Sequence, residues 1–150
     1  MRISNLLAVA VLLVSIQAVE AGEADILGAW HPEQYVLEDG TELDVSGLIF
    51  FTKSDWTVLF FVEDENGEPR RGSGEGGTYL LVGDTLTFTH FYHLSAGDEI
   101  GPIAASPLRM SVKEIEDAAE EPCRAEVGEE TMTIHFPSGN RMLFRKSSGY

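Results

Sequence analysis

The chain has 150 residues, of which 43% are hydrophobic, and a formal net charge of -15 at pH 7. This length suits a single domain with one core. So acidic a chain repels nucleic-acid phosphates and anionic lipid surfaces, and we expect neither among its partners.

The first 21 residues have the pattern of a signal peptide. An N-terminal positive charge precedes an apolar run at 6–14, and the small side chains of Val19 and Ala21 lie where a signal peptidase reads them. The run is shorter than the roughly 20 residues that cross a bilayer. The sequence therefore predicts cleavage after Ala21 and a secreted or periplasmic domain of residues 22–150, with no membrane span.

The rest of the chain has the pattern of an all-β domain. Short runs rich in Phe, Val, Thr, Ile, Leu and Tyr alternate with turn signals such as Asn66-Gly67, and no apolar helical period is sustained. We expect strands at 27–37, 47–52, 56–63, 76–82, 85–93, 107–113, 130–136 and 141–146. About eight strands joined mainly by short turns predict an up-and-down antiparallel β-barrel, or a sandwich, because either hides the sheet edges.

The connectors differ in length and composition. The acidic, Gly-rich stretch at 63–77 is interpreted as a solvated hairpin loop. The longer connectors at 94–106 and 114–129 are each expected to form a lid over one barrel mouth or a short helix, such as 112–119. The hairpin of 47–52 and 56–62 is apolar on both faces, so its outer face is expected to be covered by a loop, a helix or a partner chain.

The histidines are where an enzyme or metal hypothesis would begin. The chain has four, His31, His90, His93 and His135. Side chains three apart on a regular strand point to opposite faces, which argues against a metal pair of His90 and His93. The expected inward face is Leu86, Phe88, His90, Tyr92 and Leu94. His90 is then either a ligand-orienting or haem-ligating residue or a core histidine with one hydrogen-bond partner.

Other chemistry is not indicated. The sequence has no G-x-S-x-G nucleophile motif, no P-loop and no calcium-binding loop pattern, so no catalytic residue, metal or cofactor is predicted. Cys123 is the only cysteine, which excludes an intramolecular disulfide. It lies in an acidic segment that disfavours the thiolate, and we expect a free surface thiol or an intermolecular bridge.

A family resemblance follows from four features: Gly28-Ala29-Trp30, the hairpin at 47–58, the segment at 77–90, and Arg145 in the last strand. In these the chain resembles the calycin superfamily, and within it the bacterial lipocalin-like domain proteins. The resemblance implies a barrel base in which Gly28 and Trp30 open the first strand and Arg145 lies across the indole. This set would be structural.

The resemblance also implies a non-catalytic protein that binds a small hydrophobic or amphipathic molecule. The expected pocket is lined by Tyr79, Leu81, Phe88, His90, Tyr92, Met110 and Ile134. Two alternatives remain open. One is an interaction or inhibitor-like module with a filled barrel, which would bind a protein through loops 63–77 and 94–106. The other is a small envelope enzyme with His90 and Tyr92 as acid and base.

Overall fold

The computed structural model describes residues 26–149, which form nine strands and one short 3-10 turn. In chain order these are β1 Gly28–Val36, β2 Glu42–Phe51, β3 Asp55–Glu63, β4 Pro69–Val82, β5 Thr85–Gly97, β6 Ser106–Val112, η1 Ile115–Asp117, β7 Ala119–Val127, β8 Thr131–His135 and β9 Arg141–Lys146. All strand pairings are antiparallel. The all-β prediction is confirmed.

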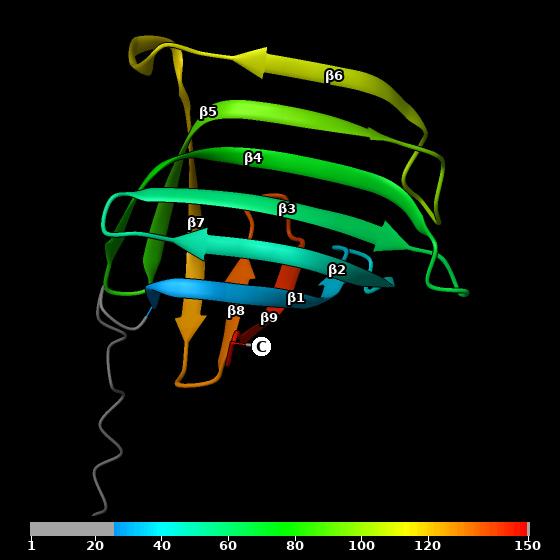
Figure 1. Ribbon diagram of the computed structural model, residues 1–150, viewed down its shortest axis with the longest axis horizontal. Coiled ribbons are helices and arrows are strands. Elements are labelled where there is room, and N and C mark those ends of the chain that lie inside the picture. The colour runs from blue at the N-terminus through cyan, green and yellow to red at the C-terminus, as the bar shows by residue number, and fades with distance from the viewer. Residues whose placement is uncertain (1–25, 150) are drawn as a thin grey trace, which may run out of the picture.

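Eight of these strands close into a barrel. The sheet order runs β4-β3-β2-β1-β9-β8-β7-β5-β6, and an additional β4–β5 pairing joins the two ends. The first half of β5, residues 85–90, pairs with β7, whereas its second half, residues 92–97, pairs with β6. Strand β6 therefore lies at the edge of the sheet, as Figure 1 shows at its upper border. The predicted up-and-down barrel is confirmed.

A sharp bend in β4 and β5 shapes the barrel. Figure 1 shows β1, β2 and β3 crossing in front of β7, β8 and β9, with β4 and β5 curving from one layer to the other. At this bend the β4–β5 register shifts between Gly76 and Gly77. A Cβ on Gly77 would lie 1.8 Å from the carbonyl oxygen of Thr89, so only glycine permits this approach. The expected hairpin loop at 63–77 is wrong, because β4 begins at Pro69.

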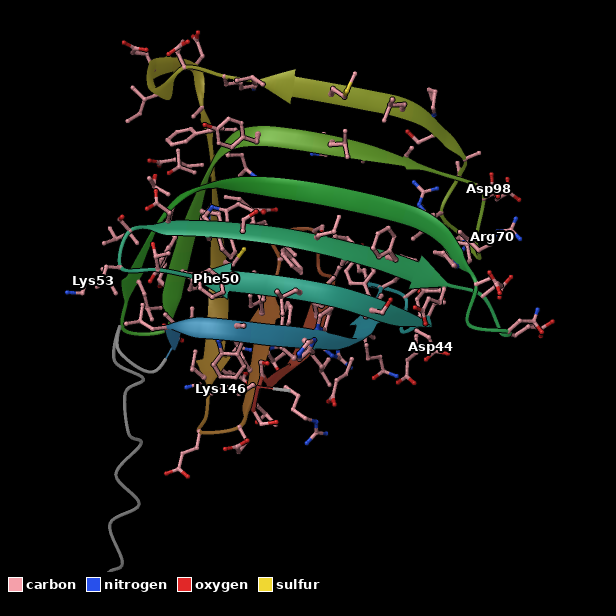
Figure 2. The ribbon with its side chains drawn as sticks, in the orientation of Figure 1. Asp44, Phe50, Lys53, Arg70, Asp98 and Lys146 are labelled. Carbon is pink, nitrogen blue, oxygen red and sulfur yellow. The ribbon has the colours of Figure 1, made fainter. Side chains whose placement is uncertain are left out.

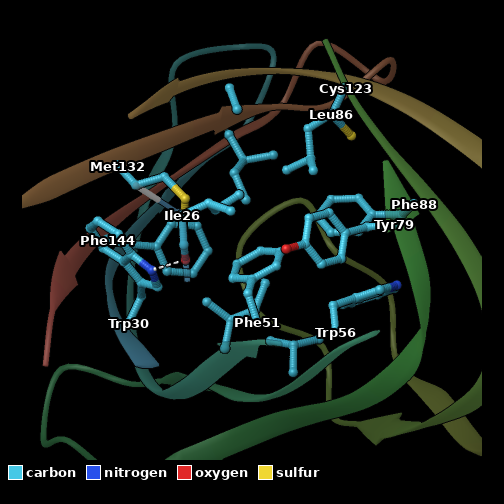
Figure 3. Close-up of a cluster of buried hydrophobic side chains, with 14 of the residues drawn as sticks. Ile26, Trp30, Phe51, Trp56, Tyr79, Leu86, Phe88, Cys123, Met132 and Phe144 are labelled. Atoms are coloured by element: carbon cyan, nitrogen blue, oxygen red, sulfur yellow. Dashed lines mark hydrogen bonds between the residues drawn. The ribbon is translucent and has the colours of Figure 1, made fainter. Parts of the chain in front are cut away.

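Part of the barrel interior is a core of buried aromatic and aliphatic side chains (Figure 3). Trp30 is fully buried, and its Nε1 donates a hydrogen bond to the carbonyl oxygen of Ile26 at 2.8 Å. The Nζ atom of Lys146, its cross-strand neighbour, lies 5.0 Å from the indole centroid. Arg145 points to the other face of β9, as strand alternation requires, and pairs with Glu33. The expected Trp30–Arg145 contact is therefore wrong, and Lys146 provides the cation.

The predicted connector at 114–129 contains one short helical turn, η1, as one of its expected forms, but strand β7 makes up most of the rest. Its residues alternate between exposed charges such as Arg124 and the buried side chains of Cys123 and Ala125. Cys123 is 4% exposed, so the expected surface thiol is wrong. Burial and the nearby Glu121 charge raise the pKa of its thiol to about 12, which keeps it protonated.

The loop at 98–105 is what remains of the predicted 94–106 connector. Its Ile100 and Ile103 pack on a second, smaller core around Leu43 and Val62. At this end of the molecule, opposite the turn at Lys53 in Figure 2, the guanidinium of Arg70 lies 2.8 Å from the Asp98 carboxylate. The loop therefore covers this second core.

The outer face of the β2–β3 hairpin is open to solvent within residues 26–149. Leu48, Phe50 and Leu59 are 38%, 42% and 48% exposed. The cover expected from the sequence is thus absent from the described part of the chain. In the same residues, no helix has the length and apolar character needed to cross a membrane.

Candidate functional site

A cavity of about 280 Å³ lies inside the barrel, beside the aromatic core. Its wall contains ten apolar or aromatic side chains, Tyr35, Ile49, Trp56, Val58, Phe60, Phe88, Ile134, Phe136, Met142 and Phe144, and five polar ones, Glu75, His90, His93, Glu121 and Ser138. An apolar cavity of roughly 150 Å³ suffices for benzene, and ligand pockets begin near 300 Å³. The space thus suits one small molecule.

The polar wall is organised around His90. Its Nδ1 lies 2.9 Å from Oε2 of Glu75, and its Nε2 lies 3.3 Å from Oε2 of Glu121. The three side chains come from β5, β4 and β7, so they connect adjacent strands at the bend. Hydrogen bonds to Glu121 and Glu75 raise the pKa of His90 to about 9, against the opposing effect of burial. His90 is therefore a cation at neutral pH, with both N–H groups directed at carboxylates.

Glu75 is the carboxylate most firmly held in this group. Burial disfavours its charged form, but hydrogen bonds from His90 and Ser73 and the His90 charge keep its pKa below the ordinary value. Its Oε1 lies 3.1 Å from the Ser73 hydroxyl and 3.5 Å from Nδ1 of His93. Glu75 is thus ionised at neutral pH, and both of its oxygens are engaged.

His90 and His93 line the same cavity, which corrects the prediction that they face opposite sides. The reason is a β-bulge: Gly76 pairs with Tyr92 and Gly77 with His90, which leaves Phe91 as an extra residue. The bulge shifts the alternation by one position. Among residues 26–149, no group of three or more His, Cys, Asp or Glu side chains could hold a metal ion.

The structure brings only part of the predicted pocket together. Phe88, His90 and Ile134 line the cavity. Tyr79 and Leu81 belong to the adjoining core, where the Tyr79 hydroxyl donates to the carbonyl oxygen of Thr52 at 2.6 Å.

Tyr92 and Met110 lie outside the cavity, with 57% and 70% of their surface exposed. The bulge at Phe91 turns Tyr92 outward, and Met110 of β6 pairs with Leu94, two residues beyond Tyr92 on β5. The expected inward position of Tyr92 is therefore wrong, and the acid–base pair of His90 and Tyr92 is not assembled.

Two aromatic residues outside the predicted pocket, Tyr35 and Trp56, also line the cavity. The Tyr35 hydroxyl accepts a hydrogen bond of 2.7 Å from the side-chain amide of Asn140, and burial raises its pKa. Trp56 is 5% exposed, and its Nε1 has no hydrogen-bond partner within the described residues. The alternation of exposed and buried residues at the start of β3 puts Trp56 inward, and nothing in the sequence marks its unpaired donor.

No protein-family model matches the chain, and no curated protein matches it in sequence. Two crystal structures share its architecture. A lipocalin-like protein from Bacteroides uniformis has a TM-score of 0.50 and 16% identity, covering 82% of this chain and 99% of that one. An uncharacterized protein from Bacteroides eggerthii has a TM-score of 0.50 and 17% identity, covering 81% and 98%. The chain has a lipocalin-like fold.

The closed antiparallel ring, together with this match over most of the chain, supports the predicted likeness to bacterial calycin-like proteins. At such low identity the match shows the fold alone. The residues of this lipocalin-like barrel must therefore supply the argument for its function.

Proposed function

We propose that this protein is a secreted or periplasmic, non-catalytic binder of one small hydrophobic or amphipathic molecule. The observation that carries the proposal is the barrel cavity of about 280 Å³, which is apolar over most of its wall and polar around His90. Such a pocket offers an apolar surface for the ligand body and a few fixed polar groups for its orientation. Export rests on residues 1–21, which lie outside the described residues.

The cavity also disfavours the filled-barrel alternative, since the protein's own side chains leave this space open.

Titration with the neutral fluorophore N-phenyl-1-naphthylamine tests the proposal. We expect a saturable rise in fluorescence with one site per chain, and a higher melting temperature at saturating probe, because a ligand that binds only the folded state stabilises it. Ile134→Trp fills the cavity and should abolish binding, with folding checked by circular dichroism.

Leu80→Trp, at a position 64% exposed, is the matched control and should bind like the wild type. Binding that survives Ile134→Trp unchanged, or a wild-type protein that does not bind the probe, would overturn the proposal.

A further inference from the structure

The cavity wall has an uneven charge. Its lining contains two glutamates, Glu75 and Glu121, and the His90 cation that lies between them, with His93 beside Glu75. No lysine or arginine belongs to the cavity lining among residues 26–149. The polar wall therefore has an excess of negative charge, within a chain whose formal net charge is already -15.

The hydrogen-bonding capacity of this wall is equally one-sided. Both N–H groups of His90 are directed at glutamates, so the His90 cation has no donor left for a ligand. Oε1 of Glu121 makes no hydrogen bond within the described residues, and the Glu121 side chain is 36% exposed. A ligand that donates hydrogen bonds thus finds a free acceptor here, whereas an anionic ligand meets two carboxylates.

The aromatic wall strengthens this preference. Tyr35, Trp56, Phe60 and Phe136 line the same cavity. The faces of aromatic rings attract cations through their quadrupole, most strongly where water is excluded. An ammonium group in the cavity would gain both from these rings and from the free oxygen of Glu121.

We propose that the cavity selects a cationic amphiphile, such as a primary amine on a short apolar body, with its ammonium group against Glu121, and rejects the carboxylate of equal length. This inference rests on the proposed ligand-binding function. It assigns a ligand class to that function. The apolar wall accommodates the hydrocarbon body of the amine and of the carboxylate alike, so the head group determines which of the two binds more tightly. Long-range attraction by the acidic surface also raises the local concentration of cations.

Displacement of N-phenyl-1-naphthylamine by octylamine, octanol and octanoate at neutral pH tests the proposal. The three compounds share one chain length and differ in head-group charge. We expect octylamine to bind more tightly than octanol and at least about tenfold more tightly than octanoate. Octanoate binding as tightly as octylamine, or octanol binding more tightly than octylamine, would overturn the cationic preference and leave the ligand-binding function intact. If all three fail while the probe binds, the preference is likewise overturned.

Two matched variants locate the effect. Glu121→Gln should weaken octylamine binding by about five- to tenfold and leave octanol binding unchanged, since the amide still accepts a hydrogen bond from His90. Glu120→Gln makes the same charge change on an exposed neighbour in β7 and should change neither. Equal losses in the two variants would mean that bulk charge attracts the amine, and would overturn the assignment of Glu121.

Discussion

The hydrogen bonds of His90 to two glutamates should make the protein's stability depend on pH. The pKa of His90 is about 9 in the folded protein and 6.5 in the reference state that represents the unfolded chain. The folded state holds this proton more tightly. The stabilisation is therefore complete below pH 6.5 and is lost as the pH rises towards 9. The difference between the two pKa values corresponds to at most about 3 kcal/mol of unfolding free energy.

Thermal melts followed by circular dichroism at several pH values across this interval measure the effect. We expect the wild-type melting temperature to fall by roughly 10 °C between pH 6.5 and 9, given the unfolding entropy of a domain of this size. His90→Gln removes the titrating group and should start near the lower wild-type value and stay level. Cys123, with its pKa of about 12, adds a further loss only above pH 9. A level wild-type profile, or the same fall in His90→Gln, would refute the reasoning.

Three further predictions concern the buried Trp30, the β4–β5 bend at Gly77 and the signal peptide. In urea titrations, Trp30→Ala should lower the unfolding free energy by about 3–5 kcal/mol, because it leaves a large cavity. Lys146→Ala leaves no such cavity and should lower it by under about 2 kcal/mol. Equal losses in the two variants would contradict this prediction. Gly77→Ala should lower the unfolding free energy by several kcal/mol, because its Cβ would lie 1.8 Å from a carbonyl oxygen. Gly74→Ala should lower it little, because the nearest atom to its Cβ would be 3.7 Å away. Comparable melting temperatures of the two variants would contradict this prediction. N-terminal sequencing of the exported protein should begin at Gly22, and an intact Met1 would disprove cleavage.

The barrel was predictable from the sequence because most strands are rich in β-branched and aromatic residues. The two ends of the meander, 27–37 and 141–146, agree closely with β1 and β9. The sequence does not indicate strand β7 because the strand contains many residues with weak strand preference, namely three glutamates, a proline and two alanines. The glycines of β4 predict a loop for a similar reason, since glycine is common both in turns and at bends in strands.

The candidate site was less predictable, because it depends on one inserted residue. Before the bulge the alternation was predicted correctly, and Phe88 and His90 line the cavity as expected. Beyond Phe91 the phase is reversed, so Tyr92 faces solvent and His93 faces the cavity. No local pattern in the sequence marks this bulge. Nor does sequence spacing show that Glu75 and Glu121, on two other strands, converge on His90.

Native mass spectrometry of the exported protein tests most directly whether the cavity holds a small molecule. After incubation with N-phenyl-1-naphthylamine, the wild type should carry one added small molecule per chain, whether the probe or a co-purified ligand. The cavity-filled Ile134→Trp variant should carry none. A wild type that stays at the mass of the bare chain, or the same adduct on Ile134→Trp, would contradict the ligand-binding account.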